Sequence, residues 1–140
     1  MTTFNLLKGH NLNLSGKPSK KIIEVESPKY FAVHPNQYKG MKPKLLVKKG
    51  DTVNIGTPLF FDKTKDSVKV ISPVNAVVED IKLGKRRVVE KISLKKIGDK
   101  SESLVLDDLK SSTDFKSFLI NSGLWSFLRQ RPFSKVPDPN

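Results

Sequence analysis

The sequence predicts a mainly β domain followed by a short C-terminal helical segment. The first part of the chain breaks into short runs of apolar and β-branched residues separated by Gly, Pro and Asn, a pattern typical of an all-β barrel or sandwich. These runs are too short to form independent helices. Beyond them the sequence becomes polar and then takes on a helical pattern of apolar residues. We expect a β domain over residues 1–97, a linker over 98–103, and a helical segment over 104–140 that leads into a further domain.

The expected strands follow one another along the first part of the chain, each ended by turn residues. They cover residues 4–8, 12–14, 21–25, 45–47, 52–55, 59–61, 68–71, 76–81 and 87–94. In the last run, alternation predicts Val88, Ile92 and Leu94 on one face and the basic side chains on the other. Glu90 does not fit this alternation.

The helical segment begins after the polar linker. Thr113 is the expected N-cap, with Asp114 in the first turn. Apolar residues at 115, 118 and 119 then share one helical face. Gly123 is expected to stop or kink the helix, which resumes until Pro132 ends it.

Composition describes a folded chain without cysteine chemistry. Of the 140 residues, 36% are hydrophobic and 29% charged, which is enough apolar material for one core. The absence of cysteine excludes disulfides and cysteine-ligated metal or iron–sulfur sites within these residues. No run approaches the ~18 apolar residues that span a bilayer, and the first ten residues, MTTFNLLKGH, lack the apolar core of a signal peptide. We therefore expect a soluble, cytoplasmic chain.

The charge of the chain favours an anionic partner. The net charge is +12, and the densest basic block, residues 82–100, has eight basic and two acidic residues. A nucleic acid, an anionic membrane face or an acidic protein would each suit this charge. The block has no aromatic residue on which bases could stack. A nucleic-acid-binding barrel is therefore the least favoured alternative, and a solvated strand face is the simplest one.

The stretch LLVKKGDTVNIGTPLFFDKTKDSVKVISPVNAVVEDI, residues 45–81, has its turn glycines and its Ser-Pro in a particular order. It resembles the lipoyl/biotinyl domains, a barrel-sandwich hybrid in which two small sheets face each other and a hairpin presents a lysine. The resemblance puts that lysine at Lys65, between Thr64 and Asp66, which are not the neighbours usual in carrier domains. Two alternatives stay open: a carrier domain modified at Lys65, and an unmodified scaffold.

Four motifs extend the resemblance over the whole chain. They are KGHNLNLSGKP (8–18), YKGMKPKLLVKKGDTVNIGTPLFFDK (38–63), GKRRVV (84–89) and SGLWSFLRQRPFSKVPDP (122–139). In this order they resemble the N-terminal part of the alpha subunit of the Na+-translocating NADH:quinone oxidoreductase (Na+-NQR). The chain departs from that family at His10 and at Glu90-Lys91.

The resemblance implies a peripheral subunit on the cytoplasmic side of the bacterial inner membrane, which is membrane-associated through its complex. That complex oxidises NADH, reduces ubiquinone as its substrate and exports Na+. The expected partners are the other subunits and quinone, with no nucleic acid. Flavins, iron–sulfur centres and the NADH site belong to other subunits, so this part should bind no cofactor and be inactive alone. The equivalent subunit of a ferredoxin:NAD-type electron-transport complex is a second alternative, and it would continue into cysteine-rich motifs.

No catalytic, cofactor-binding or metal-binding residue emerges, because no nucleophile–base pattern, phosphate loop or ligand cluster is present. The closing segment, residues 123–139, is unusual in combining the only tryptophan with arginines and phenylalanines. Trp125, Arg129, Arg131 and Phe133 are the candidate contacts to quinone or another subunit, because they combine apolar area with guanidinium donors. The alternative is that the aromatics pack in a core and the arginines form surface ion pairs. We also expect this segment to pack against chain beyond Asn140.

Overall fold

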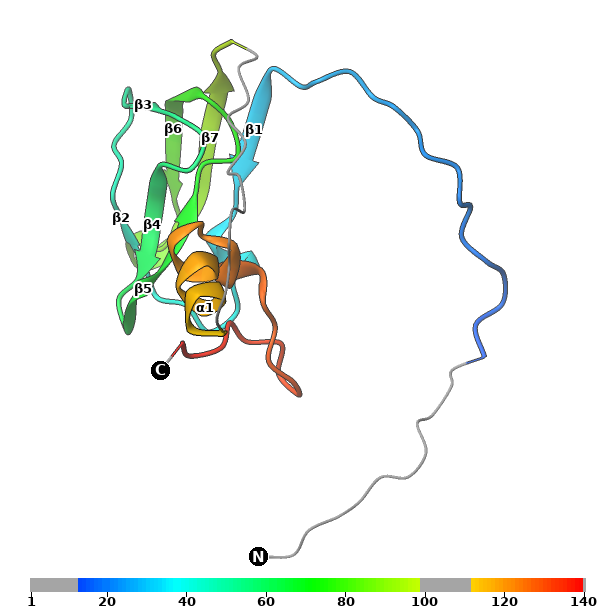
Figure 1. The fold of residues 1–140 in the computed structure, drawn as a ribbon. Helices are drawn as coiled ribbons and strands as arrows, with labels where there is room; N and C mark the ends of the chain where they lie inside the picture. Colours follow the sequence, from blue (N-terminus) through cyan, green and yellow to red (C-terminus); the bar gives the residue numbers. More distant parts are fainter. Residues whose placement is uncertain (1–12, 99–111, 140) are drawn as a thin grey trace, which may run out of the picture.

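Two antiparallel sheets form the body of the molecule in the computed structural model, which describes residues 13–98 and 112–139 (Figure 1). One sheet has the strand order β1-β7-β6-β3 and the other β2-β4-β5. The strands are β1 (Tyr30–Val33), β2 (Pro43–Leu45), β3 (Thr52–Val53), β4 (Pro58–Asp62), β5 (Lys65–Ile71), β6 (Ala76–Leu83) and β7 (Val89–Lys96). Short 3-10 turns η1 (Pro35–Gln37) and η2 (Lys85–Arg87) interrupt the sheets, and α1 (Ser112–Asn121) and η3 (Leu124–Phe127) follow them.

The hydrophobic core lies between the two sheets and draws on both. Leu59 and Phe60 of β4 are fully buried, as are Ile92 and Leu94 of β7. Along β5 the burial alternates, with Val68 and Val70 inside and Lys69 outside, which is the period of a half-buried strand. The predicted mainly β fold is therefore confirmed.

Five expected runs overlap observed strands, namely those at 52–55, 59–61, 68–71, 76–81 and 87–94. The run at 45–47 overlaps β2 only at Leu45, because the strand begins earlier, at Pro43. The edge strand β1 was not expected, and it pairs with β7, where Tyr30 lies opposite Lys95. Its apolar run is short and lies between prolines, so it carries little strand signal of its own.

The strands expected at 12–14 and 21–25 are wrong over the described residues, and the run at 4–8 lies outside them. Residues 13–28 contain no strand and extend away from the sheets (Figure 1). Ile22 is 89% exposed and Val25 84% exposed. A strand is stable only when its backbone groups find a partner strand, and no strand of the described residues pairs with this segment.

A β-bulge between β6 and β7 explains why Glu90 does not fit the inside–outside alternation expected for β7. The register runs from Lys82↔Lys91 directly to Leu83↔Val89, so Glu90 is the extra residue. An extra residue reverses the inside–outside alternation beyond it. Val89 is therefore buried while Val88 is 56% exposed, and the expectation that Val88 shares the inner face is wrong.

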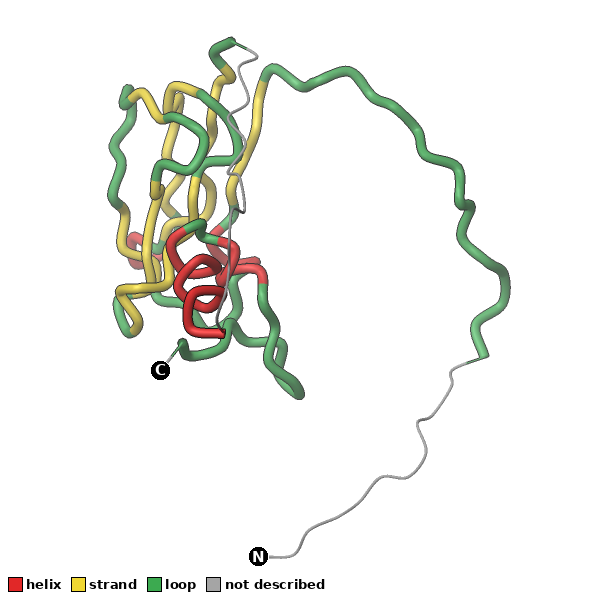
Figure 2. Tube along the Cα trace, in the orientation of Figure 1, coloured by secondary structure: helices red, strands yellow, loops and turns green. Residues whose placement is uncertain are grey.

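The helical segment packs beside β5, with α1 and η3 together at one end of the sheets (Figure 2). Thr113 lies inside α1, which begins at Ser112, so it is not the N-cap. The predicted stop is confirmed, because α1 ends at Asn121 and Gly123, two residues later, has a left-handed φ of 73°. The expectation that the helix resumes after Gly123 and continues to Pro132 is wrong. Only the short turn η3 forms there, and Leu128 is already extended.

Residues 99–111 lie outside the described residues, and most of the expected linker and the expected start of the helical segment at 104 fall there. Within the described residues, none of the helices has the length and apolar character required to cross a membrane.

Candidate functional site

The closing segment folds back onto the β domain. It forms a narrow turn in which the Gln130 N–H donates to the Lys135 carbonyl at 2.8 Å. The chain then passes the turn that follows η1, where the Val136 N–H donates to the Lys39 carbonyl at 3.1 Å. Val136 is only 5% exposed. These contacts are with the β domain, and packing of the segment against chain beyond Asn140 stays a prediction.

Trp125 is a packing residue within this arrangement. Its ring is half-buried and lies against the hydrophobic core. Its indole Nε1–H donates to the Pro137 carbonyl at 3.1 Å, which satisfies the polar end of an otherwise apolar side chain. The neighbouring Ser126 is buried and donates from Oγ to the Gly123 carbonyl at 2.8 Å. Trp125 therefore joins η3 to the end of the closing segment.

The Arg129 side chain donates hydrogen bonds to backbone carbonyls at the end of η3. Its Nη1 donates to the carbonyls of Ser126 at 2.7 Å and Leu128 at 2.9 Å. Its Nη2 reaches the Gln37 carbonyl at 3.4 Å. The bonds to Ser126 and Leu128 satisfy carbonyls at the end of η3 that have no further helical turn to accept from, and the bond to Gln37 joins this end to the β domain.

Tyr38 connects the closing segment to the core. Its ring packs edge-on against Phe60 at 5.8 Å and against Phe127 at 6.3 Å between ring centroids. The Arg129 guanidinium lies 5.8 Å from the centre of the same ring. Burial raises the pKa of Tyr38 above its ordinary value of 10.0, and the nearby Arg129 charge opposes this by lowering it. Tyr38 was not predicted, because its partners are distant in the sequence.

Arg131 and Phe133 lie at the exposed turn between Gln130 and Lys135. Phe133 is 72% exposed, and its ring has the Lys135 ammonium 5.8 Å from its centre. Arg131 is exposed and has no hydrogen-bond or ion-pair partner among the described residues. The four predicted contact residues are therefore divided, with Trp125 and Arg129 bonded within the fold and Arg131 and Phe133 facing solvent.

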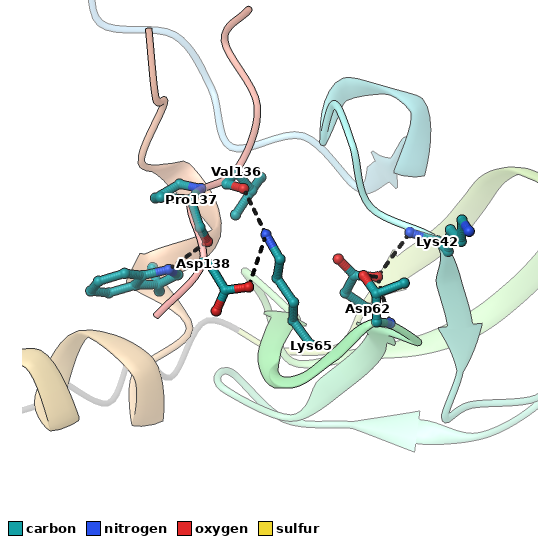
Figure 3. Close-up of polar contacts among 8 residues, drawn as sticks. Lys42, Asp62, Lys65, Val136, Pro137 and Asp138 are labelled. Atoms are coloured by element: carbon teal, nitrogen blue, oxygen red, sulfur yellow. Dashed lines mark hydrogen bonds and ion pairs between the residues drawn. The ribbon is translucent and has the colours of Figure 1, made fainter. Parts of the chain in front are cut away.

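Lys65 begins β5 directly after the hairpin turn and faces the closing segment (Figure 3). Its Nζ lies 3.7 Å from a carboxylate oxygen of Asp138 and donates to the Val136 carbonyl at 3.5 Å. Its side chain is only 24% exposed. A carrier lysine has to be presented to a modifying ligase, and this lysine is instead held against its own chain.

The hairpin turn before Lys65 is fixed by a buried carboxylate. Asp62 is 2% exposed. Its Oδ1 accepts hydrogen bonds from the Thr64 N–H at 3.0 Å, the Thr64 hydroxyl at 2.9 Å and the Lys42 N–H at 3.0 Å. Figure 3 shows Lys42 and Asp62 beside Lys65. The carboxylate therefore ties the hairpin to the segment that precedes β2.

A cavity of about 540 Å³ opens elsewhere, between a turn of the β domain and the end of α1. It is lined by Asn54, Ile55, Gly56, Thr57, Ile71, Asn121 and Ser122. None of the four predicted contact residues lines it. Among the described residues, no group of three or more His, Asp or Glu side chains is placed to hold a metal ion.

Comparison with known proteins identifies two family models along the chain. The model of the NqrA N-terminal barrel-sandwich hybrid domain matches residues 4–96, which confirms the predicted fold class. The model of the NqrA second alpha/beta domain matches residues 110–140.

Curated relatives match almost the whole chain. The Na(+)-translocating NADH-quinone reductase A subunit of Marinomonas sp. (strain MWYL1) is 39% identical over 140 residues, which cover 96% of this chain and 32% of the relative. The proteins of the same name from Pseudomonas aeruginosa (strain UCBPP-PA14) and Vibrio vulnificus (strain YJ016) are 37% and 36% identical over 137 residues each. Those matches cover 94% and 93% of this chain, and 31% and 30% of the relatives. The chain thus spans about a third of the length of the curated relatives it matches.

Proposed function

Because the chain belongs to the NqrA family of the Na(+)-translocating NADH-quinone reductase, we propose that it acts as part of that respiratory enzyme. The observation that carries the proposal is 39% identity across 96% of the chain, together with the family model over residues 4–96. The family resemblance read from the sequence is thereby confirmed. The proposed complex oxidises NADH, reduces ubiquinone and exports Na+ on the bacterial inner membrane, with this chain on the cytoplasmic side.

Within that complex the chain is proposed to be a scaffold, with flavins, iron–sulfur centres and the NADH site on other subunits. The two-sheet body and the folded-back closing segment support this role, because they form a packed base for an exposed turn. Arg131 and Phe133 of that turn are the proposed contacts to a neighbouring protein of the complex. Arginine and aromatic residues are enriched at protein interfaces.

A quinone contact at the same two residues is a weaker proposal. Ligand sites are concave and bury most of their ligand, whereas Phe133 is 72% exposed. Contact with a neighbouring protein therefore fits the turn better than a quinone headgroup does. Trp125 and Arg129 are proposed to act indirectly, by holding the turn in position.

The experiment is a purification from native membranes. The gene is tagged in its chromosomal context, the membranes are solubilised, and the bound proteins are identified by mass spectrometry. Redox subunits should co-purify, together with NADH-dependent reduction of a quinone. Recovery of the tagged protein without redox subunits would overturn the proposal. Activity with ferredoxin in place of quinone would favour the ferredoxin:NAD-type complex.

Two variants test the turn within the same purification. Arg131→Ala with Phe133→Ala should lower the recovery of partner subunits, while Lys69→Ala on the exposed face of β5 should not. The thermal midpoint of the 140-residue chain serves as the check on folding, since both turn side chains are exposed. Normal assembly with a raised KM for quinone would instead favour a quinone contact. Normal assembly and kinetics would exclude both contacts and leave the family assignment intact.

The carrier alternative is tested by the intact mass of the protein expressed in its own host. A scaffold has the mass of the unmodified chain. A lipoyl or biotinyl addition mapped to Lys65 would make the chain a carrier and overturn the scaffold proposal.

A further inference from the structure

The hairpin between β6 and β7 ends in a tip that is both cationic and apolar. This tip, residues 83–88 with the sequence LGKRRV, contains three consecutive basic residues, and all three are exposed. Leu83 and Val88 at its two ends are 49% and 56% exposed. Aliphatic side chains beside a basic triplet in water are the combination found in segments that lie in a membrane interface.

A second pair of cations joins the tip from the other sheet. A cavity of about 440 Å³ is bounded by Arg86 and Arg87 of the tip and by Lys42 and Lys63 beside the β4–β5 hairpin. Its remaining lining is uncharged and mostly apolar, and consists of Met41, Pro43, Val88 and Val89. None of the four cationic heads has a hydrogen-bond or ion-pair partner among the described residues. The four basic residues therefore border one mostly apolar cavity, and no ion pair among the described residues neutralises their charges.

Two acidic groups that adjoin these cations in the chain are already engaged. Asp62, next to Lys63, is buried and accepts three hydrogen bonds at one oxygen. Glu90, at the base of the tip, lies 3.2 Å from the Lys82 ammonium. The tip thus presents a net positive surface to any external partner.

The backbone of the tip is unfavourable for the residues it carries. Arg86 and Arg87 both have left-handed φ values, 56° and 58°. That conformation favours glycine or asparagine over residues with a large side chain. The Val88 N–H donates to the Lys85 carbonyl at 3.2 Å, so the two positive φ values belong to the tight turn that closes the hairpin and sets both arginines at its end.

We propose that the cationic tip docks on an anionic bilayer surface. The basic side chains of the tip and its cavity would meet headgroup phosphates, while Leu83 and Val88 enter the interface beside them. Charge complementarity carries this choice of partner, together with the exposed aliphatic pair. A free phosphate would use the cations and leave Leu83 and Val88 without a role. Nucleic acid is disfavoured because the tip has no aromatic side chain on which bases could stack.

This contact goes beyond the proposed function, because the chain would touch lipid through its own residues and not only through partner subunits. It can therefore be tested on the 140-residue chain alone. The purification from membranes described above tests the complex separately, so either proposal can fail without the other.

The test is co-sedimentation with lipid vesicles of two compositions. One is phosphatidylcholine, and the other is phosphatidylcholine with phosphatidylglycerol in equal amounts. The chain should bind the second and not the first. Raising the salt to about 1 M should weaken binding, because the screening length falls to about 3 Å.

Substitutions locate the contact. Arg86→Asn with Arg87→Asn should weaken binding about 30-fold, since each basic residue near the surface contributes about fivefold. Asparagine tolerates the left-handed backbone, so the fold should be retained. The matched control is Lys69→Asn with Lys95→Asn, which removes the same charge from exposed strand positions and should have an effect of less than about twofold. Leu83→Ser with Val88→Ser should also weaken binding.

The outcomes separate the alternatives. If the arginine variant and the lysine control lose vesicle binding equally, the chain is attracted by its net charge alone, and the docking site is overturned. Absence of vesicle binding would overturn it too, and a titration with inorganic phosphate would then show whether the cavity takes a soluble anion. If the arginine variant does not fold, the wild-type chain is bound to vesicles that contain spin-labelled lipid, and its methyl NMR signals are recorded. Broadening of the Leu83 and Val88 methyl signals supports docking, and its absence excludes it.

Discussion

The Lys65 ammonium lies 3.7 Å from the Asp138 carboxylate and joins the first residue of β5 to the end of the closing segment. The same ammonium donates to the Val136 carbonyl. The hairpin position that resembles a carrier lysine is therefore used to hold the chain's own C-terminal segment. The consequences of this contact can be measured residue by residue.

Replacing Lys65 should loosen the closing segment without unfolding the protein. The pair is partly exposed, with side-chain exposures of 24% and 51%, and pairs of this kind contribute about 0.2–1 kcal/mol. Lys65→Met should therefore lower the free energy of unfolding by no more than about 1 kcal/mol. The Val136 amide should nevertheless exchange faster with solvent in hydrogen-exchange NMR, because the segment opens locally more often.

Lys63→Met is the control for this exchange experiment. Lys63 is in the same turn, and its side chain has no partner among the described residues. Val136 should exchange at the wild-type rate in this variant. Equal exchange of Val136 in both variants would mean that Lys65 does not restrain the segment.

Position 123 requires glycine for two reasons, its backbone conformation and the closeness of a neighbouring side chain. Its φ is 73°, and an added Cβ would lie 2.8 Å from Cγ2 and 3.0 Å from Cγ1 of Ile71. Gly123→Ala should therefore add about 1–2 kcal/mol of backbone strain to about 1–3 kcal/mol of overpacking. Urea denaturation followed by circular dichroism measures the sum.

The comparison for Gly123 is Gly50→Ala. Gly50 also has a positive φ, 94°, but no atom lies within 4 Å of an added Cβ. Only the backbone contribution should appear there, so Gly123→Ala should be the more destabilising of the two. The reverse order would show that Ile71 relaxes away from the added methyl group.

The Asp62 carboxylate should be the most important polar group of the β4–β5 hairpin. Asp62→Ala leaves the Thr64 and Lys42 N–H groups without their acceptor, and such a loss costs about 1–3 kcal/mol. Thermal denaturation should show the corresponding decrease. Asp66→Ala, an exposed carboxylate in the same hairpin, should change stability by no more than about 0.5 kcal/mol. If the two variants lose similar stability, the loss comes from removing a negative charge and not from removing the hydrogen bonds that Asp62 accepts.

Stability should decrease at alkaline pH through Tyr38. Burial raises the pKa of its phenol in the folded protein above the ordinary 10.0, which applies to the unfolded chain. The folded state therefore holds the proton more tightly. The stabilising contribution is complete below pH 10.0 and is lost as the pH rises through the folded-state pKa.

Tyr38→Phe should remove this part of the alkaline loss, as measured by the free energy of unfolding against pH. Tyr30→Phe is the matched control, since Tyr30 is 56% exposed and its removal leaves the surroundings of Tyr38 unchanged. A wild-type alkaline profile in Tyr38→Phe would contradict the assigned role of the buried phenol.

Sequence reasoning was most successful where the signal is local. Five strand positions and the stop at Gly123 followed from alternation, turn residues and the preference of glycine for positive φ. It failed at 21–25, where an apolar run has the composition of a strand but no partner. It also failed at Val88, because the extra residue at Glu90 reverses the alternation, and a bulge is visible only in the pairing of two strands.

The candidate site shows the same division between local and distant information. The unusual composition of the closing segment marked Trp125, Arg129, Arg131 and Phe133 as a set. Their separation into bonded and exposed members depends on Tyr38, Gln37 and Pro137, whose positions are set by the packing of other elements. No spacing rule connects these residues.

The amino-acid sequence alone determined the family, the mainly β class and the basic character of the chain, because motifs, alternation and charge are properties of consecutive residues. Only the tertiary structure decided that Lys65 is held by Asp138 and that Arg86 and Arg87 meet Lys42 and Lys63 at one cavity. These contacts join segments that are distant in the chain, and their geometry depends on how the two sheets pack around a shared core.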